Sequence, residues 1–394
     1  MTRPTVALVR CPTYDREQVR EAVAEAFGLT PGADDLLGEG RRVLLKPNLL
    51  SSNDPPERAV NTHPEFVRAV AEYCIAHGCK VFIGDSCGSL AAGSTAKAIA
   101  VTGLDVVADE TGAEIVNFDK IPSVQVGVAG GRVMTSVGVA EVYQEVDVVV
   151  TLPKFKTHGL TLLTGALKNQ FGMLPGRTKK DTHVAAPKPV AMAEALVDVY
   201  SAARPHLAVM DGIVGMEGNG PAAGPPKEVG LVLASLDGVA LDAVVANIMG
   251  FAPGEVLTTA FAHRRGLGIG DLAEIDIAGV SLDEARIDGF KMPPQRIQSI
   301  LFSLIPGAVV RWLFNQLGSR RPVILDDRCV RCGLCVANCP VGAMQLKKGK
   351  ITCATSKCIS CYCCTEVCPE RAIEMRRPWA GRLIGFLAAR RERK

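Results

Sequence analysis

The chain has 394 residues, of which 48% are hydrophobic and 22% are charged, and its formal net charge at pH 7 is +3. This composition is that of a well-buried globular protein and excludes a largely disordered chain. The length leaves room for two or three domains. Because the first four residues lead directly into a strand-like segment, we find no signal peptide and expect a cytoplasmic protein.

The near-neutral net charge conceals an asymmetry along the chain. Residues 318–394 contain 16 Lys and Arg against 6 Asp and Glu, a net charge of +10, whereas the preceding residues carry −7. Basic and aromatic residues do not interleave and no nucleic-acid motif is recognisable, so we expect no nucleic-acid partner. The basic end fits a docking surface for an acidic redox protein, or for an anionic membrane surface.

From residue 5 to about 280, short apolar runs alternate with helical patterns, which is typical of an α/β fold. Strands are expected at 6–9, 43–45, 81–84, 114–118, 124–128, 132–137, 147–152, 207–210 and 229–234, and helices at 16–27, 65–76, 95–101, 162–170, 190–203 and 239–249. The β-branched run 147–152 is typical of a buried parallel strand. We therefore predict an α/β domain with a largely parallel sheet and helices on both faces.

Polar side chains follow four of these strands at the point where each is expected to end. Because ligands bind outside the carboxyl ends of parallel strands, we expect these side chains to converge on one crevice. The alternative is that each is an ordinary solvated strand end. The side chains are Lys46 and Asn48, then Asp85, then Lys154, Lys156 and His158, and finally Asp211.

The segments beside these strands add further candidates. The spacing of Thr161, Thr164 and Lys168 would place them on one helical face. Residues 175–183, which end in His183, read as a mobile cationic loop, and a Gly/Pro-rich loop with Glu217 follows Asp211. A phosphate-binding Walker loop and a dinucleotide-binding GxGxxG are both missing from the sequence.

These residues suggest roles in binding an anion and in moving protons. Lys154, Lys156 and Lys168, with Lys46 and His158, would hold a carboxylate or phosphate and stabilise negative charge. Either Asp211 or Glu217 would supply protons or bind a divalent metal, and either His158 or His183 would act as general acid. An additional cofactor of the α/β domain, either an anion or a divalent metal, is expected to bind at Lys46, Asn48, Asp85 and His183.

Near the C-terminus, the run C-x2-C-x2-C-x3-C-P occurs twice, 29 residues apart. This run holds [4Fe–4S] clusters, and its fourth cysteine binds the cluster of the other half. Two zinc knuckles are the alternative, but zinc needs no C-P ending in both halves. The sequence therefore predicts one cluster on Cys329, Cys332, Cys335 and Cys368, and a second on Cys358, Cys361, Cys364 and Cys339.

The repeat continues beyond the cysteines, since residues 343–346 align with residues 372–375. The region from about Ile324 to Met375 thus resembles a bacterial-type two-cluster ferredoxin, which implies a small α+β module with low-potential one-electron chemistry. Cys363 aligns with Leu334, a position without a ligand role, and Cys353 has no counterpart among the ligands. Both are therefore expected to be structural.

Four further segments of the large N-terminal region resemble the uncharacterised domain-of-unknown-function family 362, whose members are frequently fused to such a module. The resemblance covers about residues 5–280 and implies no substrate and no catalytic residue. The segments are Lys46-Pro-Asn48, Pro153 to His158, Leu163 to Asn169 with Phe171-Gly172, and Asp211 to Pro221.

We expect an α/β ligand-binding domain at 1–285, a helical linker at 286–322, the ferredoxin-like domain at 323–376 and a basic amphipathic tail at 377–394. The apolar stretch in 296–317 is interrupted by Pro306 and Arg311, and so falls short of a membrane span. Linker and tail either pack as helices between the domains or make peripheral membrane contact.

The leading functional hypothesis is a ferredoxin-dependent oxidoreductase, in which two [4Fe–4S] clusters exchange electrons with an anionic small molecule in the α/β domain. The alternative is a non-catalytic electron-carrier or assembly subunit whose α/β domain docks a protein partner. A redox-controlled transferase or a ligand sensor also stays open. In the first two cases, a redox protein is the expected partner.

Overall fold

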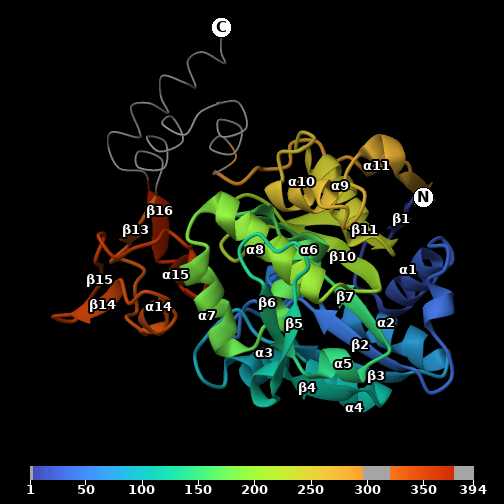
Figure 1. Cartoon of the computed structure of the whole chain (residues 1–394), viewed down its shortest axis with the longest axis horizontal. Helices are drawn as coiled ribbons and strands as arrows, with labels where there is room; N and C mark the ends of the chain where they lie inside the picture. Colours follow the sequence, from blue (N-terminus) through green and yellow to red (C-terminus); the bar gives the residue numbers. More distant parts are fainter. Residues whose placement is uncertain (1–2, 295, 297–319, 377–394) are drawn as a thin grey trace, which may run out of the picture.

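The computed structural model describes residues 3–294, 296 and 320–376, and its largest element is a ten-stranded mixed sheet (Figure 1). Along the main path the order is β12-β1-β11-β10-β7-β2-β3-β4, and only β11 runs antiparallel to its neighbours. The predicted α/β fold with a largely parallel sheet is confirmed. The strands of the path are β12 (Asp276–Gly279), β1 (Thr5–Arg10), β11 (Pro226–Ser235), β10 (Leu207–Met216), β7 (Val148–Leu152), β2 (Arg42–Pro47), β3 (Lys80–Asp85) and β4 (Glu114–Asn117).

Helices cover both faces of this sheet, as the alternation of buried side chains along β2 shows. Val43 and Leu45 pack in the core with helices on one face, whereas Leu44 packs in the core on the other. A strand buried on both faces reads as a continuous apolar run, which is why β2 and β7 were recognisable in the sequence. The first face carries α1 (Arg16–Gly28), α2 (Pro64–Ala76), α3 (Ser94–Thr102) and α4 (Leu104–Thr111), and the second carries α6 (Gly165–Asn169), α8 (Pro189–Ala202), α9 (Gly238–Met249) and α10 (Leu257–Arg264).

The predicted helix at 162–170 is wrong in its first half. Strand β8 (Lys154–His158) pairs with β9 (Leu162–Leu163), and the helix begins only at Gly165. Gly165 has φ of 59°, in the left-handed region, and an added Cβ would lie 2.3 Å from Asp242 Oδ1. This close approach lets Asp242 accept hydrogen bonds from Ala166 N and Leu167 N, which fixes where the helix starts.

Three other predicted segments also differ from the structure. The segment expected to be a cationic loop is α7 (Gly176–Ala185), and the strand expected at 132–137 is β6 (Ser136–Ala140), paired with β5 (Ser123–Gly127). Strand β10 runs for ten residues instead of ending at Met210. Asp211 therefore lies inside a strand, and its carboxylate does not mark a strand end.

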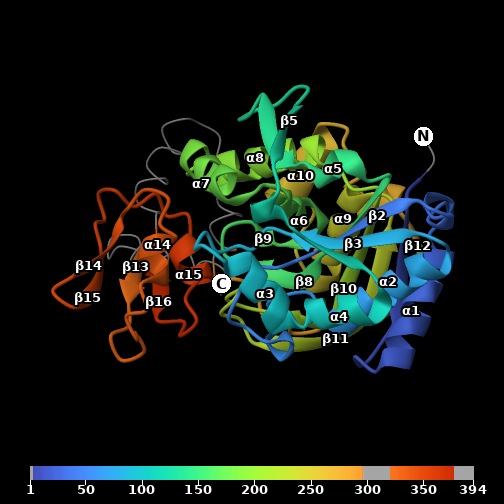
Figure 2. The same ribbon diagram turned by 90° about the horizontal axis from the view of Figure 1, so that it is seen from below.

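The C-terminal module has the twofold pattern expected from its repeat. Strand β13 (Arg321–Ile324) pairs with β16 (Ile373–Arg376), β14 (Met344–Lys347) pairs with β15 (Lys350–Cys353), and each half has a short helix, α14 (Leu334–Ala337) or α15 (Cys363–Glu366). Both views place the module beside α7 and α3 of the α/β domain (Figures 1 and 2). Its small apolar core includes Met344, Ile351 and Ile373.

Most of the predicted linker and the whole basic tail lie outside the described residues. At the linker's described ends, Arg296 Nε donates a hydrogen bond of 2.8 Å to Glu255 Oε1, and β13 already begins at Arg321. Among the described helices, none combines the length and apolar character needed to cross a membrane.

Candidate functional site

Two small cavities in the C-terminal module are each lined by four of the eight predicted ligand cysteines. Each cavity takes three cysteines from one half of the repeat and one from the other half, which is the predicted crossing. Four thiols around an apolar space form the donor set of an iron–sulfur cubane, so these residues fit [4Fe–4S] clusters. The first cavity is lined by Cys329, Cys332, Cys335 and Cys368, and the second by Cys339, Cys358, Cys361 and Cys364, together with Cys353.

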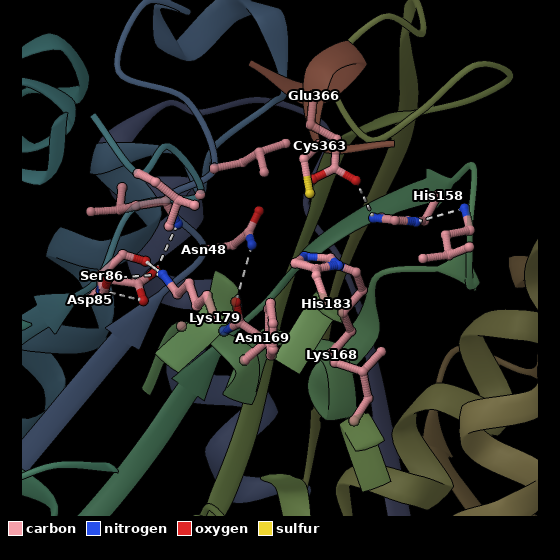
Figure 3. Close-up of a pocket in the computed structure, with 18 of the residues that line it drawn as sticks. Asn48, Asp85, Ser86, His158, Lys168, Asn169, Lys179, His183, Cys363 and Glu366 are labelled. Carbon is pink, nitrogen blue, oxygen red and sulfur yellow. Dashed lines mark hydrogen bonds and ion pairs between the residues drawn. The ribbon is translucent and has the colours of Figure 1, made fainter. Parts of the chain in front are cut away.

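A larger cavity lies where the module meets the α/β domain (Figure 3). It encloses about 760 Å³ of space between atoms, part of it open to solvent. The module contributes Asn338, Cys363 and Glu366 to its wall. Because Cys363 lies between Cys361 and Cys364 in the chain, this wall is directly beside the second cysteine cavity. The α/β domain contributes polar side chains that include Asn48, Asp85, Ser86, His158, Lys168, Asn169, Lys179 and His183.

Three polar contacts hold the module against this opening. Asn338 Oδ1 accepts a hydrogen bond from Leu90 N, just ahead of α3. Glu366 Oε1 lies 3.2 Å from His158 Nε2, and Arg371 Nη2 lies 3.6 Å from Asp54 Oδ1. The docked module therefore closes one wall of the cavity, which sequence reasoning about the α/β domain alone did not anticipate.

The backbone fixes the tautomer of His158 within this interface. Its Nδ1 accepts hydrogen bonds from Leu160 N and Thr161 N, so the ring proton is on Nε2, which faces Glu366. Burial and the charge of Lys168 lower the pKa of His158 to about 4. Burial raises the pKa of Glu366, but the contact with His158 and the nearby cations outweigh it and hold this pKa at about 2. A neutral imidazole thus faces a carboxylate.

The two lysines of the cavity wall differ in how their ammonium groups are satisfied. Lys179 Nζ donates to Ser86 O, Ser86 Oγ and Cys87 O, and burial lowers its pKa to about 8. The ammonium group of Lys168 makes no hydrogen bond or ion pair with the residues that the structure describes. Burial also lowers the pKa of Lys168, an effect that Glu366 partly offsets. Lys168 is therefore the cation with unused donors at this cavity.

Lys46 lies behind the cavity wall, where it pairs with Asp85. Lys46 Nζ is 3.0 Å from Asp85 Oδ1, and neither side chain has more than 2% of its surface exposed. Gly172 packs against the pair so closely that an added Cβ would lie 2.5 Å from Lys46 Nζ. Lys46 does not line the cavity as predicted, since its charge is used in the core, whereas Asn48 and Asp85 do line it.

The prediction that Lys154 and Asp211 line the same pocket is also wrong. Strands β8 and β10 run parallel side by side, with Asp211 in register with Lys154. Lys154 Nζ donates hydrogen bonds of 2.6 Å to both Asp211 Oδ2 and Tyr14 Oη, and Tyr14 Oη in turn donates to Asp211 Oδ1 at 2.8 Å. These groups form a buried network in the sheet, away from the interdomain cavity.

Two further predicted residues also lie outside the cavity. Lys156 is 1% exposed and its Nζ donates a hydrogen bond of 2.6 Å to Val60 O. Glu217 Oε1 pairs with Lys291 Nζ at 3.1 Å, and its Oε2 accepts from Lys291 N. Of the ten predicted α/β-site residues, five therefore line the cavity, namely Asn48, Asp85, His158, Lys168 and His183.

His63 lies beside the buried network and should make the stability of the protein depend on pH. His63 stacks on Tyr14, its Nδ1 accepts from Glu65 N at the start of α2, and burial lowers its pKa to about 4. The unfolded chain therefore binds more protons than the folded chain between about pH 4 and 6.5, so stability rises with pH across this window. His63→Asn keeps the capping acceptor but does not titrate. In this variant we expect the free energy of unfolding to rise less steeply with pH than in the wild type, by up to about 1.4 kcal/mol per pH unit.

Urea unfolding measured by circular dichroism at several pH values tests this. His77→Asn is the matched control, because His77 sits at the opposite, C-terminal end of α2. Identical slopes for His63→Asn and the wild type would contradict the assignment of a neutral, buried His63.

Comparison with known proteins agrees with this division of the chain. The profile described as Domain of unknown function (DUF362) matches residues 43–247, and the one described as 4Fe-4S dicluster domain matches residues 321–369. A thylakoid-associated protein of Synechocystis sp. is 34% identical over 296 residues, covering 73% of this chain and 88% of that protein. The chain belongs to the DUF362 family. Its fused ferredoxin-type domain makes it an iron–sulfur protein of electron transfer.

Among solved structures, the DUF362 protein is matched to the lactate racemase apoprotein of Thermoanaerobacterium thermosaccharolyticum, with a TM-score of 0.43 and 13% sequence identity. The match covers 64% of this chain and 58% of that one. Several polar or thiol side chains of the interdomain cavity were not selected as site residues from the sequence. They include Ser86, Asn169, Lys179, Cys363 and Glu366. Asn169 carried a usable signal, because it lies within a segment that resembles the family, whereas Cys363 and Glu366 reach the site only through docking.

Proposed function

We propose that this protein is a ferredoxin-linked oxidoreductase that exchanges electrons with an anionic small molecule bound in the interdomain cavity. The observation that carries the proposal is the position of Cys363, which lines this cavity and is flanked in the chain by Cys361 and Cys364. Two [4Fe–4S] clusters, when bound by the eight cysteines, supply low-potential one-electron transfer. A ligand in the cavity would thus lie next to a redox centre.

The side chains of the cavity suit such a ligand. The Lys168 ammonium has donors for a carboxylate or phosphate and stabilises negative charge that develops there. The apolar side chains Phe171, Met192 and Leu196 also line the cavity and exclude water from part of it. His183 lines the cavity with an Nδ1 that has no hydrogen-bond partner among the described residues, so its ring can relay a proton to the ligand.

A redox protein is the expected partner, because the reaction needs a source of electrons. Two-electron reduction of the ligand requires two electrons, delivered singly by that carrier, and two protons. Cys332 and the neighbouring Val330, which is 62% exposed, face solvent at the first cysteine cavity. The described part of the module carries 10 Lys and Arg against 5 Asp and Glu, an excess that the two thiolate-bound clusters would offset in part, and an acidic carrier suits the remaining basic side chains.

The test is to reduce the anaerobically purified protein and to screen anionic metabolites for reoxidation, followed by visible absorbance. We expect one class of anion to reoxidise the protein. In Lys168→Gln the apparent dissociation constant of that anion should rise about 30-fold, because a charge-assisted hydrogen bond contributes about 2 kcal/mol. Lys180→Gln, at an exposed position of α7, is the control and should behave like the wild type. A broad panel without any acceptor or donor would contradict the proposal.

The second candidate is a non-catalytic electron-carrier subunit whose α/β domain docks a protein. It is favoured by the basic surface of the module, which suits protein docking whether or not the cavity holds a ligand. A stoichiometric partner that dissociates as salt rises would support the carrier, whereas thermal stabilisation by a small anion would support the enzyme.

A further inference from the structure

The orientation of the Asn48 side chain is determined by its neighbours rather than by the cavity. Asn169 Nδ2 donates to Lys46 O at 3.1 Å and to Thr151 Oγ1 at 2.8 Å. Because the carbonyl can only accept, Asn169 Oδ1 must be the free acceptor, and it takes a hydrogen bond of 3.2 Å from Asn48 Nδ2. Flipping either amide would break this chain, so Asn48 Oδ1 is held away from Asn169.

Asn48 Oδ1 is thereby an obligate acceptor at the cavity. It is buried and has no hydrogen-bond partner among residues 3–294, 296 and 320–376. In Figure 3 this oxygen is turned away from Asn169, and Cys363 and Glu366 lie beyond it across the cavity. A buried acceptor left without a donor is destabilising, so it selects for a ligand that satisfies it.

We propose that the ligand of this cavity is a small organic acid that carries an O–H or N–H donor in addition to its anionic group. The inference rests on the proposed function for the anionic group, which Lys168 binds, and adds the donor, which Asn48 Oδ1 accepts. The remaining carbon atoms lie against Phe171, Met192 and Leu196.

The same geometry should make the cavity bind the hydroxyl form of such an acid and its carbonyl form with different affinities. A hydroxyl group donates its proton to Asn48 Oδ1, whereas a carbonyl oxygen there would place two acceptors face to face with no proton between them. The hydroxylated acid should therefore bind more tightly than the corresponding oxo acid, and also more tightly than the unsubstituted acid.

Isothermal titration calorimetry of the full-length holoprotein with four matched probes tests the inference. The probes are 2-hydroxybutyrate, butyrate, 2-oxobutyrate and the neutral 2-hydroxybutyramide. We expect 2-hydroxybutyrate to bind about 10- to 100-fold more tightly than each of the others. In Asn48→Ser and Asn48→Ala the advantage over butyrate should fall to about threefold or less, while the advantage over the neutral amide is kept. Lys180→Gln is the matched control and should keep both advantages.

Each outcome bears on the inference in a defined way. Equal binding of butyrate and 2-hydroxybutyrate by the wild type overturns the donor requirement, and equal binding of the amide overturns the role of Lys168. If no probe binds the wild type, the inference is also overturned. The wild-type comparison does not depend on whether an Asn48 variant folds.

The two proposals can fail separately. A hydroxylated acid that binds, but neither reduces the oxidised protein nor reoxidises the reduced protein as its oxo form, supports this inference and contradicts the oxidoreductase. If an anion reoxidises the protein although neither it nor its reduction product carries a donor group, the oxidoreductase is supported and this inference is contradicted.

Discussion

Lys154→Ala is expected to lower the free energy of unfolding by about 3 to 5 kcal/mol, because it leaves the Asp211 carboxylate buried without its counterion. Both side chains are 0% exposed, and Lys154 Nζ lies 2.6 Å from Asp211 Oδ2. Burial lowers the pKa of Lys154, and the Asp211 carboxylate opposes this shift. Anaerobic urea unfolding followed by circular dichroism measures the effect.

Two variants separate the charge effect from a loss of packing. Lys350→Ala removes an exposed lysine that pairs with Asp326 at 3.5 Å, and should change stability by about 0.5 kcal/mol or less. The double variant Lys154→Met with Asp211→Asn removes both charges, keeps an acceptor for Tyr14 Oη and His63 N, and should be more stable than Lys154→Ala alone. A stability loss in Lys154→Ala no larger than that in Lys350→Ala would show that the pair is not buried as described.

Cys339→Ala is expected to lower the iron content from about eight to about four atoms per chain, because each cubane holds four irons. Cys339 lines the cavity formed by Cys358, Cys361 and Cys364, although 19 residues separate it from the first of them. Cys353 lines the same cavity and offers a replacement thiol. The variants are therefore made in a Cys353→Ala background, and iron and acid-labile sulfide are measured after anaerobic purification.

Pairs of substitutions reveal which cysteines share a cluster. Cys339→Ala with Cys361→Ala should lose no more iron than either change alone, whereas Cys339→Ala with Cys332→Ala should lose nearly all of it. Cys363→Ala is the control and should keep about eight irons, since Cys363 lines the interdomain cavity instead. If Cys339→Ala with Cys361→Ala lost clearly more iron than either change alone, the crossing of ligands between the two halves would be contradicted.

Local sequence patterns were sufficient to predict most of the fold. Strands such as β2 and β7 are apolar on both faces, and the cysteine spacing of the module determines which thiols can share a cubane. Local patterns failed where a distant side chain decides the structure. Asp242, 76 residues from Ala166, sets the start of α6.

The candidate site could be predicted only in part, for a similar reason. The rule that ligands bind at the ends of parallel strands found Asn48, Asp85 and His158. It also selected Lys154 and Asp211, because nothing local to either residue shows that β8 and β10 lie in register. The wall from the module depends on docking between domains, which a strand-end rule cannot describe.

The central claim is that a ligand of the interdomain cavity lies beside a redox centre. It is tested most directly by electron–nuclear double resonance on the dithionite-reduced protein with the tightest-binding acid, labelled with ¹³C. We predict a ¹³C hyperfine coupling to the reduced iron–sulfur signal in the wild type and in Lys180→Gln. At the same acid concentration, the coupling should be lost in Lys168→Gln. Saturation with the labelled acid, verified by calorimetry, without any ¹³C coupling would contradict the claim.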